Sequence, residues 1–245
     1  MKYAIFGPGR VGTNIAAYLA HLGHEATLIT RQQSKYDKAH CMRIIADADI
    51  IAAALPDSAI GPWHAEWSRD IGSKLMIHFS GSISVEGMHA FHPLYSFPPH
   101  VLEPDTLKSI AFACPDDGPA FAEVFAGAPN PHFEISDKDR AHYHALAVLS
   151  GNFAAFLWNE TAKTFEDRHN VPAESILAGY FSGVVDRFRE SPRSSLTGPI
   201  ARRDRASAEA NLAALKGDEK LEELYRAFLR AAWPDYDQHK DGNQQ

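Results

Sequence analysis

Three glycines near the N-terminus, Gly7, Gly9 and Gly12 in YAIFGPGRVGTNIAAYLA, are the first residues whose spacing indicates chemistry. Glycine tolerates positive φ and lets another group approach the backbone closely. The three glycines follow a run of strand-forming residues and precede a helical pattern, so we expect a strand, a tight turn and a helix. Amides at the start of such a helix have no partner within it, and together with the helix dipole they bind phosphate groups.

The spacing of these glycines predicts a turn that binds a dinucleotide. In that interpretation the first glycine forms the turn, the second admits the pyrophosphate, and the third lets the helix pack closely on the strand. The alternative is a glycine-rich turn that binds nothing, and the strand and helix on either side favour the dinucleotide. The cofactor contacts expected from this turn are Gly7, Pro8, Gly9, Arg10, Val11 and Gly12.

The second strand candidate, EATLIT, ends at Thr30 and is followed by Arg31. An Asp or Glu here would bond the ribose 2′-hydroxyl of NAD, whereas an arginine accommodates the 2′-phosphate of NADP. We therefore expect Thr30 and Arg31 to bind NADP, with Gln32 and Ser34 as further donors. The alternative for Arg31 is a solvent-exposed cation with no ligand.

The third strand candidate leads into Leu55 and Pro56 within ADIIAAALPDSAI. The loop that they begin is expected at the carboxyl edge of the sheet, beside the second half of the cofactor. We assign both residues to cofactor binding, although a proline here is equally a residue that only ends a strand.

The fourth strand candidate ends in IHFSGS, which brings His78, Ser80 and Ser82 to the same edge of the sheet. Hydride transfer from a nicotinamide requires a proton donor, and the unperturbed pKa of histidine suits that role. His78 and Ser80 are therefore catalytic candidates. The alternative is a buried histidine bonded to the backbone, next to a serine that caps a turn.

A long, mostly apolar segment, HALAVLSGNFAAFLW, is too short for a membrane span of roughly 18 residues and is expected to be a buried helix. His144 and Asn152 are expected on one face of this helix, with His142 turned away. Polar groups in such a segment need partners, either in the core or in a substrate. Asn152 is a catalytic candidate, and packing in a dimer is the alternative.

Further downstream, TGPIARRD interrupts the helical pattern. Thr197 is a catalytic candidate because a hydroxyl at a break between helices is able to reach into a cleft. Arg202 and Arg203 are candidates for binding a substrate carboxylate, with a solvated charged face as the alternative. His92, before Pro93, ends or opens another strand, and because the chain has 13 histidines, no single one is a strong candidate for a ligand or an acid. No spacing among the histidines and cysteines resembles a zinc site, so no metal is expected.

The elements that must position these residues are predicted from hydrophobic periodicity. Continuous apolar runs in the first half are typical of parallel strands covered on both faces, and the second half has helical spacing. The expected strands are 2–6, 26–29, 50–54, 75–78, 91–95 and 110–113, and the expected helices include 11–22, 172–188, 205–215 and 220–232.

This order of elements predicts an α/β fold in which an N-terminal Rossmann-type, doubly wound, mostly parallel sheet precedes an all-helical C-terminal domain. We expect a dinucleotide-binding domain over 1–135, a helical domain for the substrate cleft and dimerisation over 136–236, and a flexible tail over 237–245. Ser136, with Asp139 three positions later, is expected to cap the first helix of the second domain.

The composition bounds the class of protein. The 245 residues are 45% hydrophobic and 22% charged, as in an ordinary globular protein, and the formal net charge is −7. Nucleic-acid-binding proteins present a basic face to the phosphates, so this balance argues against nucleic acid and for a small-molecule partner. With two cysteines, no signal peptide pattern and no membrane span, a cytoplasmic location is expected.

Several stretches taken together resemble a known family. YAIFGPGRVGTNIAAYLAHLGHEATLITR, ADIIAAALPDSAI, HFSGSISVE, FHPLYSF and LTGPIARRDRASAEANLAAL are similar to the Rossmann-like proteins that carry a C-terminal helical domain of unknown function. These are distant relatives of pyrroline-5-carboxylate reductase, ketopantoate reductase and the β-hydroxyacid dehydrogenases. The resemblance implies an NADP-binding fold, a helical dimerisation domain that makes a homodimer, and a reductase without an assigned substrate.

One departure bears on the chemistry. The hydroxyacid dehydrogenases and ketopantoate reductases place a Lys and an Asn four residues apart on the corresponding helix. If Asn152 is that Asn, Val148 stands where the Lys should be, so the general acid is unassigned. The leading expectation is an NADP-dependent oxidoreductase that reduces a small polar carbonyl or imine bound between the domains. A non-catalytic NADP(H)-binding sensor or regulatory protein is the alternative, and a dimerisation protein that has lost the cofactor is a third.

Overall fold

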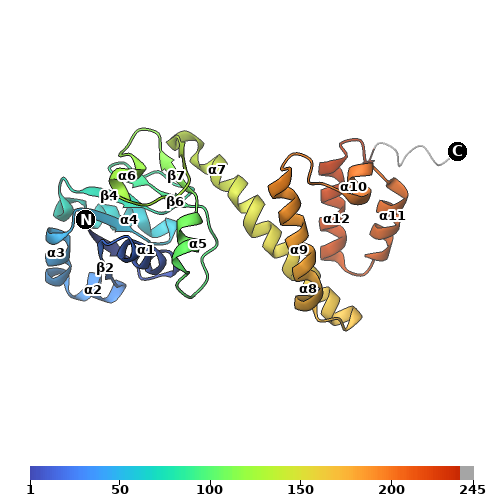
Figure 1. Ribbon diagram of the computed structural model, residues 1–245, viewed down its shortest axis with the longest axis horizontal. Coiled ribbons are helices and arrows are strands. Elements are labelled where there is room, and N and C mark those ends of the chain that lie inside the picture. Colours follow the sequence, from blue (N-terminus) through green and yellow to red (C-terminus); the bar gives the residue numbers. More distant parts are fainter. Residues whose placement is uncertain (238–245) are drawn as a thin grey trace. The chain divides into compact units, whose positions relative to one another are not determined.

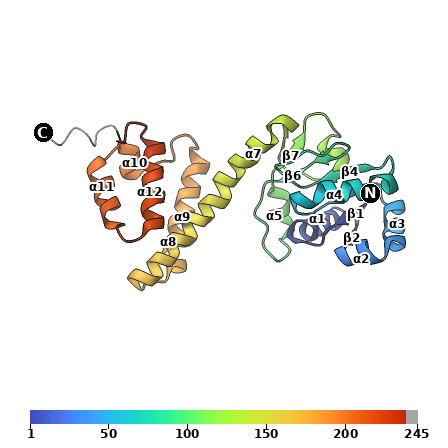
Figure 2. The ribbon, with the colours of Figure 1, turned by 180° about the vertical axis from the view of Figure 1, so that it is seen from behind.

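A computed structural model describes residues 1–237, and its elements are labelled in Figure 1 and seen from behind in Figure 2. The chain divides into an α/β unit, Met1–Asn152, and a helical unit that begins at Phe153. The predicted flexible tail, 237–245, lies outside the described residues except for Asp237.

The α/β unit is built on a five-stranded parallel sheet with the strand order β2-β1-β3-β4-β5. Its strands are β1 (Lys2–Phe6), β2 (Glu25–Ile29), β3 (Ile50–Ala53), β4 (Leu75–His78) and β5 (His89–Ala90). The chain order reverses between β1 and β3, because β2 lies on one side of β1 and β3 on the other. In open α/β sheets, ligands bind outside the carboxyl ends of the strands at such a reversal.

Helices connect these strands and cover both faces of the sheet. They are α1 (Arg10–His21), α2 (Arg31–Tyr36), α3 (Lys38–Asp47) and α4 (Asp57–Ile71). Because side chains alternate along a strand, Tyr3 and Ile5 pack on one face with Ile15 of α1, whereas Phe6 packs on the other with Trp63 of α4. The sheet is therefore buried on both sides, as its continuous apolar strands predict, and the α/β fold is confirmed.

The predicted strand over 91–95 does not form as one strand. The chain leaves the first sheet after β5 and enters a second, three-stranded sheet of β6 (His92–Pro93), β7 (Phe112–Pro115) and β8 (His132–Ile135). Proline lacks the amide that a strand interior needs, which keeps β6 short. Strand β7 begins two residues later than predicted, because Ile110 ends helix α5 (Pro104–Ser109). A short helix, α6 (Phe121–Val124), precedes β8.

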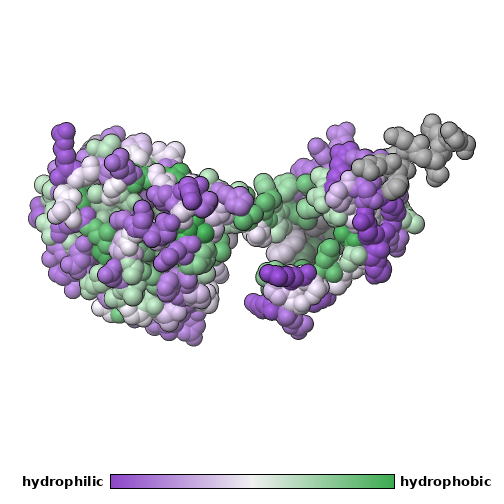
Figure 3. All heavy atoms as spheres, turned by 90° about the horizontal axis from the view of Figure 1, so that it is seen from above, coloured by the Kyte–Doolittle hydropathy of each residue, from purple (hydrophilic) through white to green (hydrophobic). Residues whose placement is uncertain are grey.

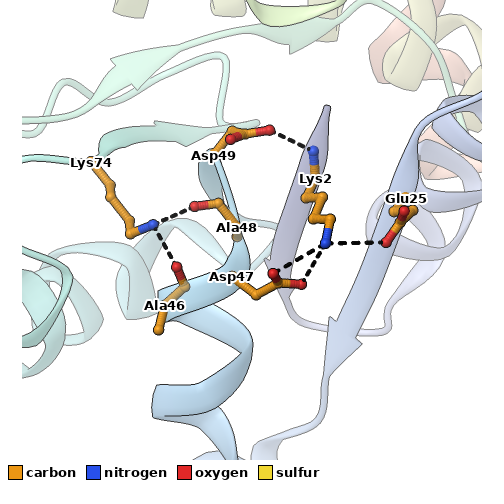
Figure 4. Close-up of polar contacts among 7 residues, drawn as sticks. All are labelled: Lys2, Glu25, Ala46, Asp47, Ala48, Asp49 and Lys74. Atoms are coloured by element: carbon orange, nitrogen blue, oxygen red, sulfur yellow. Dashed lines mark hydrogen bonds and ion pairs between the residues drawn. The ribbon is translucent and has the colours of Figure 1, made fainter.

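The amino edge of the large sheet is closed by charged groups that pair with one another (Figure 4). The ammonium group of Lys2 lies 3.0 Å from an oxygen of Asp47 and 3.8 Å from one of Glu25. Lys74 donates to the carbonyl oxygens of Ala46 and Ala48 at the end of α3, where a cation satisfies orphan carbonyls and the helix dipole. These contacts hold the end of α3 against the starts of β1 and β4.

The predicted change from strands to helices occurs at the end of β8. A single 3₁₀ turn (Asp137–Asp139) leads into α7 (Arg140–Ala147), a π-helical turn (Val148–Phe153) and α8 (Ala154–His169). Ser136 does not accept a backbone amide as predicted, because its hydroxyl donates to Asp139 Oδ2 at 2.6 Å instead. The compact α/β unit extends beyond the predicted boundary at 135, since it includes α7 and part of the π-helical turn.

The second unit contains only helices in its described part. After α8 come α9 (Ala173–Glu190), α10 (Gly198–Arg202), α11 (Arg205–Ala214) and α12 (Glu219–Ala232). Trp158 of α8 stacks on Phe181 of α9, and Ala208, Leu229, Trp233 and Tyr236 form a small core. Among residues 1–237, no helix combines the length and the apolar character that a membrane crossing requires.

Candidate functional site

The glycine turn lies where β1 gives way to α1, and its three glycines have different surroundings. Gly7 has φ of +105°, and a Cβ built on it would lie 2.3 Å from the carbonyl oxygen of Ala54. A Cβ on Gly12 would lie 2.0 Å from the oxygen of Gly7. Gly9 has no described atom within 4 Å of such a Cβ. Packing therefore requires a residue without a side chain at positions 7 and 12. At position 9 a side chain would face open space, so packing does not require glycine there.

The first turn of α1 faces that open space. Gly9 is the N-cap residue, no side chain caps the helix, and its first turn carries no acidic group. The leading amides of a helix have no acceptor within it and lie at the positive end of its dipole. Pro8, Gly9 and Arg10 are exposed, and Val11 is partly exposed. This arrangement suits an anion such as a pyrophosphate.

The two residues that follow β2 and were predicted to bind a 2′-phosphate have different roles in the structure. Thr30 caps α2: its hydroxyl accepts the amide of Gln33 at 3.2 Å and donates to the Gln33 side chain at 2.8 Å. Arg31 is the first residue of α2 and is exposed, and its side chain makes no hydrogen bond or ion pair with any other residue in the range 1–237. The guanidinium is thus available to a ligand, while the Thr30 hydroxyl already serves the helix.

Leu55 and Pro56 follow β3 beside the glycine turn. Pro56 is the N-cap residue of α4 and is exposed, and Leu55 is near enough to Gly7 that a Cβ there would meet its side chain at 3.0 Å. The next residue, Asp57, accepts a hydrogen bond from the hydroxyl of Ser82 at 2.5 Å. Asp57 was not predicted, because a lone acidic residue at a helix start has an ordinary role there.

His78 ends β4 and is wholly buried. Neither of its ring nitrogens has a hydrogen-bond partner among the described residues. Burial, with the nearby cation of Arg140 as a second cause, lowers the pKa of His78 to about 4, so the ring is neutral at pH 7. A substrate reaches this side chain only if its neighbours move. Ser80 is also buried, and its oxygen accepts the amides of Ser82 and Ile83.

A cluster that sequence reasoning did not assemble lies beyond β4 and β5. Nδ1 of His92 lies 2.8 Å from the hydroxyl of Tyr143 on α7. The His92 ring also packs edge to face on His144, with ring centroids 5.6 Å apart. Gly81 lies against both histidines, since a Cβ on it would meet His144 at 2.7 Å and His92 at 3.0 Å. We call Gly81, His92, Tyr143 and His144 the His–Tyr cluster.

Arg140, at the start of α7, supplies a buried positive charge near this cluster. Its side chain is 1% exposed, Nε donates to Asp137 at 3.1 Å and Nη2 to the carbonyl of Ala90 at 3.1 Å. Within residues 1–237, Nη1 has no partner. Burial, then the charge of His144 and that of Arg140, lowers the pKa of His92 to about 4. Burial raises the pKa of Tyr143 to about 12, against an opposing effect of Arg140.

The remaining predicted residues belong to other elements of the chain. Asn152 is exposed in the π-helical turn, at the end of the first unit. Thr197 is exposed at the N-cap of α10 and does not cap it. Arg203 pairs with Asp235, which gives it a structural role in the helical unit. In the described part of the chain, no three His, Cys, Asp or Glu side chains gather to hold a metal ion.

The candidate groups are arranged along the carboxyl edge of the sheet in the order of the strands that they follow. Arg31 follows β2, the glycine turn follows β1, Leu55 and Pro56 follow β3, and the His–Tyr cluster lies beyond β4 and β5. Four strand intervals of about 4.8 Å separate β2 from β5, so this edge extends over about 19 Å. A ligand that contacts groups at both ends of this edge would be an elongated molecule.

Part of the chain matches a known family of protein domains. Residues 113–232 match the family described as "Domain of unknown function (DUF2520)". The match confirms the helical domain of unknown function that the sequence resemblance implied, and it begins earlier than the helices, at β7. No curated protein sequence matches this chain.

Solved structures share the fold over nearly the whole chain. A Bacteroides fragilis protein assigned as an NADP oxidoreductase is 21% identical, with a TM-score of 0.72 over 94% of this chain and 97% of that one. Pyrroline carboxylate reductase of Plasmodium falciparum with NADP bound is 14% identical, with a TM-score of 0.59 over 95% of each chain. An imine reductase of Streptomyces aurantiacus is 16% identical, with a TM-score of 0.60 over 99% and 95%. These similarities establish the Rossmann-like fold.

Proposed function

We propose that the chain binds NADP(H) and is an oxidoreductase that reduces a small polar carbonyl or imine compound. The observation that supports this most directly is the difference among the three glycines. Packing explains Gly7 and Gly12 but not the absence of a side chain at Gly9, at the uncapped start of α1, and close approach of a ligand to the backbone would explain it. Access of a pyrophosphate to the backbone supplies that explanation.

The residues present fit NADP better than NAD. An acidic residue at the end of β2 would bond the ribose 2′-hydroxyl of NAD. This chain has the exposed guanidinium of Arg31 just after β2 instead. A guanidinium forms strong, charge-assisted hydrogen bonds with a phosphate. The turn from Gly7 to Gly12 would hold the pyrophosphate, and Leu55 and Pro56 would contact the other half. NADPH, when bound, supplies a hydride to the carbon of the substrate.

The choice of substrate class draws on the similar structures. Two of them are named as a pyrroline carboxylate reductase with NADP bound and as an imine reductase. Both names denote reduction of a carbon–nitrogen double bond, which supports an imine or the related carbonyl as the substrate here. Because the fold alone is shared at this level of identity, the substrate is a proposal for this chain.

Calorimetric titration with NADPH and NADH tests the proposal. We expect the wild-type protein to bind NADPH much more tightly than NADH. Arg31→Asp should lower NADPH affinity tenfold to a hundredfold, by loss of charge-assisted bonds, and leave NADH affinity nearly unchanged. Arg69→Asp is the matched control, since Arg69 is an exposed arginine near the end of α4, away from the carboxyl edge. Absence of binding to either nucleotide would refute the proposal.

The non-catalytic alternative makes a different prediction. A sensor or regulatory protein would bind NADPH with the same dependence on Arg31 but would not oxidise it in the presence of any carbonyl or imine. Incubation of the NADPH complex with a panel of small aldehydes, ketones and cyclic imines, followed by nicotinamide absorbance, distinguishes the two.

We also propose that the protein is a homodimer formed through its C-terminal helices and that it acts in the cytoplasm. Helix α9 exposes a row of apolar side chains four residues apart: Ile176 at 42%, Tyr180 at 65%, Val184 at 38% and Phe188 at 56%. Figure 3 shows green, hydrophobic residues at the surface of the helical unit. A continuous apolar row of this kind is typical of a protein–protein interface, and a second copy would bury it. The free, buried thiols of Cys41 and Cys114 suit a reducing compartment.

A further inference from the structure

The proposed reduction needs a proton for the oxygen or nitrogen of the substrate, and the residues at the carboxyl edge differ in their ability to supply it. His78 is wholly buried and neutral. The hydroxyl of Ser82 donates to Asp57, and a serine is a far weaker acid than a phenol. Tyr143 is partly exposed and its hydroxyl has a defined partner. It is therefore the acid to consider.

The position of Tyr143 is fixed from several sides. Its hydroxyl lies 2.8 Å from Nδ1 of His92, which follows β5, and its ring packs edge to face on that of His92 with centroids 5.7 Å apart. Phe133 of β8 packs on the ring from another direction, with centroids 5.8 Å apart. The hydroxyl is thereby held beside the segment that follows β4, where Gly81 lies against His92. Figure 1 shows the start of α7 next to β6 and β7.

One group near Tyr143 favours loss of its proton during a reaction, although burial raises the Tyr143 pKa to about 12. The buried cation of Arg140 opposes the rise that burial causes in the pKa of Tyr143, so it stabilises the tyrosinate. His92 is neutral at pH 7 and can donate from Nδ1 to a tyrosinate or accept from a tyrosine. The other titratable groups near the pair are Cys114 of β7, whose burial raises its own pKa to about 11, His144 on α7, and Asp57 of α4, whose charge opposes the fall in the pKa of His92.

Resting on the proposed function, we infer that Tyr143 is the proton donor for the reduction and that His92 is its positioning residue. As hydride reaches the substrate carbon, the O–H bond of Tyr143 breaks and its proton passes to the substrate oxygen or nitrogen. The electron pair of that bond stays on the Tyr143 oxygen, where Arg140 and the His92 N–H stabilise it. Water then returns a proton to the tyrosinate. This assigns the general acid that the absent lysine left open.

The first test needs no substrate. NADP⁺ carries a positive charge on its nicotinamide ring and NADPH does not. If Tyr143 lies near that ring, NADP⁺ lowers its titration midpoint relative to NADPH by about one to two pH units, for a charge within about 8 Å at an effective dielectric constant of about 20. The readout is the ultraviolet absorbance of tyrosinate between about pH 9 and about pH 12, with circular dichroism to verify folding. Tyr143→Phe should abolish the difference, and Tyr225→Phe, a partly buried tyrosine of α12, should retain it.

The outcomes separate the two proposals. If neither nucleotide binds, the proposed function fails. If both bind and the difference between NADP⁺ and NADPH is unchanged in Tyr143→Phe, the cofactor proposal stands and the assignment of Tyr143 is overturned. A difference present in the wild type and lost only in Tyr143→Phe supports the assignment.

The second test measures turnover with 2-methyl-1-pyrroline as the probe imine and 4-nitrobenzaldehyde as the probe carbonyl. Tyr143→Phe should lower kcat by about a hundredfold to ten-thousandfold and leave NADPH affinity within about twofold. Unchanged kcat in Tyr143→Phe would overturn the assignment.

His92 is tested through its effect on Tyr143. His92→Phe removes the hydrogen bond, so the tyrosine titration midpoint should rise and kcat should fall about tenfold with little change in KM. His92→Asn keeps a donor and should restore part of both. A titration midpoint that is the same in the wild type and in His92→Phe would show that His92 does not position Tyr143.

Discussion

The side chain of Asn14 in α1 accepts the backbone amide of Leu102 at 2.8 Å. The same side chain donates to the carbonyl oxygens of His100 and Arg10, and it is 1% exposed. One buried amide thus joins the helix that follows the glycine turn to a loop distant in sequence. That loop, 94–103, contains no helix or strand. It carries the exposed side chains Leu94, Tyr95 and Val101.

Asn14→Ala should lower the free energy of unfolding by about 2 kcal/mol, because two backbone groups of the loop lose their partner in a buried setting. Urea denaturation monitored by circular dichroism measures the change. Asn152→Ala is the control, since Asn152 is exposed, and its effect should stay within about 0.5 kcal/mol. Equal effects of the two substitutions would mean that the Asn14 bonds contribute little.

The same added methyl group should act differently at two glycines. Gly12→Ala places a Cβ against the oxygen of Gly7 and should cost about 3 kcal/mol or more in stability. Gly9→Ala meets no described atom and has extended backbone, so it should change stability by less than about 1 kcal/mol and lower NADPH affinity at least tenfold. Urea denaturation and calorimetry together check this pair. Unchanged affinity in Gly9→Ala would count against a pyrophosphate at this position.

Stability should fall as the pH is lowered below 6.5, partly because of His78. The unfolded imidazole takes up a proton near pH 6.5, whereas the folded one stays neutral down to about pH 4. Between these values the unfolded state binds more protons, so acid favours unfolding by about 1.4 kcal/mol per pH unit for this ring. His92 adds a contribution of the same sign.

His78→Phe should remove the contribution of that ring. At pH 7.5 this variant should be nearly as stable as the wild type, since the ring nitrogens have no partners among residues 1–237, and at about pH 5 it should be more stable. Urea denaturation at both pH values gives the comparison. His142→Gln, an exposed histidine, is the control and should follow the wild type.

The apolar row on α9 predicts the oligomeric state. Analytical ultracentrifugation should find a dimer in the wild type, and Tyr180→Glu combined with Val184→Glu should convert it to a monomer, because charges would be buried in the interface. Phe228→Glu changes an exposed aromatic residue of α12 outside the row and should remain dimeric. A monomeric wild type would refute the proposed interface.

The first four strands and the glycine turn were predictable because their signals are local. Strands β1, β3 and β4 are short, mostly apolar runs, β2 largely alternates polar and apolar residues, and each glycine has its role within the turn itself. Strand β8 was not predicted, although its residues HFEI alternate polar and apolar, since it is four residues long and its side chains are mostly exposed. The π-helical turn Val148–Phe153 lies in an apolar segment whose composition is that of an ordinary helix.

The His–Tyr cluster could not be predicted from the sequence for a different reason. It joins His92 to Tyr143, 51 residues away in the sequence, and depends on how α7 packs against the α/β unit. The burial of Arg140 has no local signal either, because arginines are mostly exposed. His78 was placed correctly at the end of β4, but its complete burial follows from neighbours that the sequence does not identify.

The three glycines of the turn differ in what a larger residue would disturb at each position. A descendant of this chain that abandoned its ligand would still have to keep Gly7 and Gly12, because the chain could not pack with larger residues there. Of the three glycines, only Gly9 could then be replaced by other residues without a packing clash. Across such descendants, the residue at position 9 therefore records whether the ancestral ligand is still in use, while positions 7 and 12 record only the inheritance of the fold.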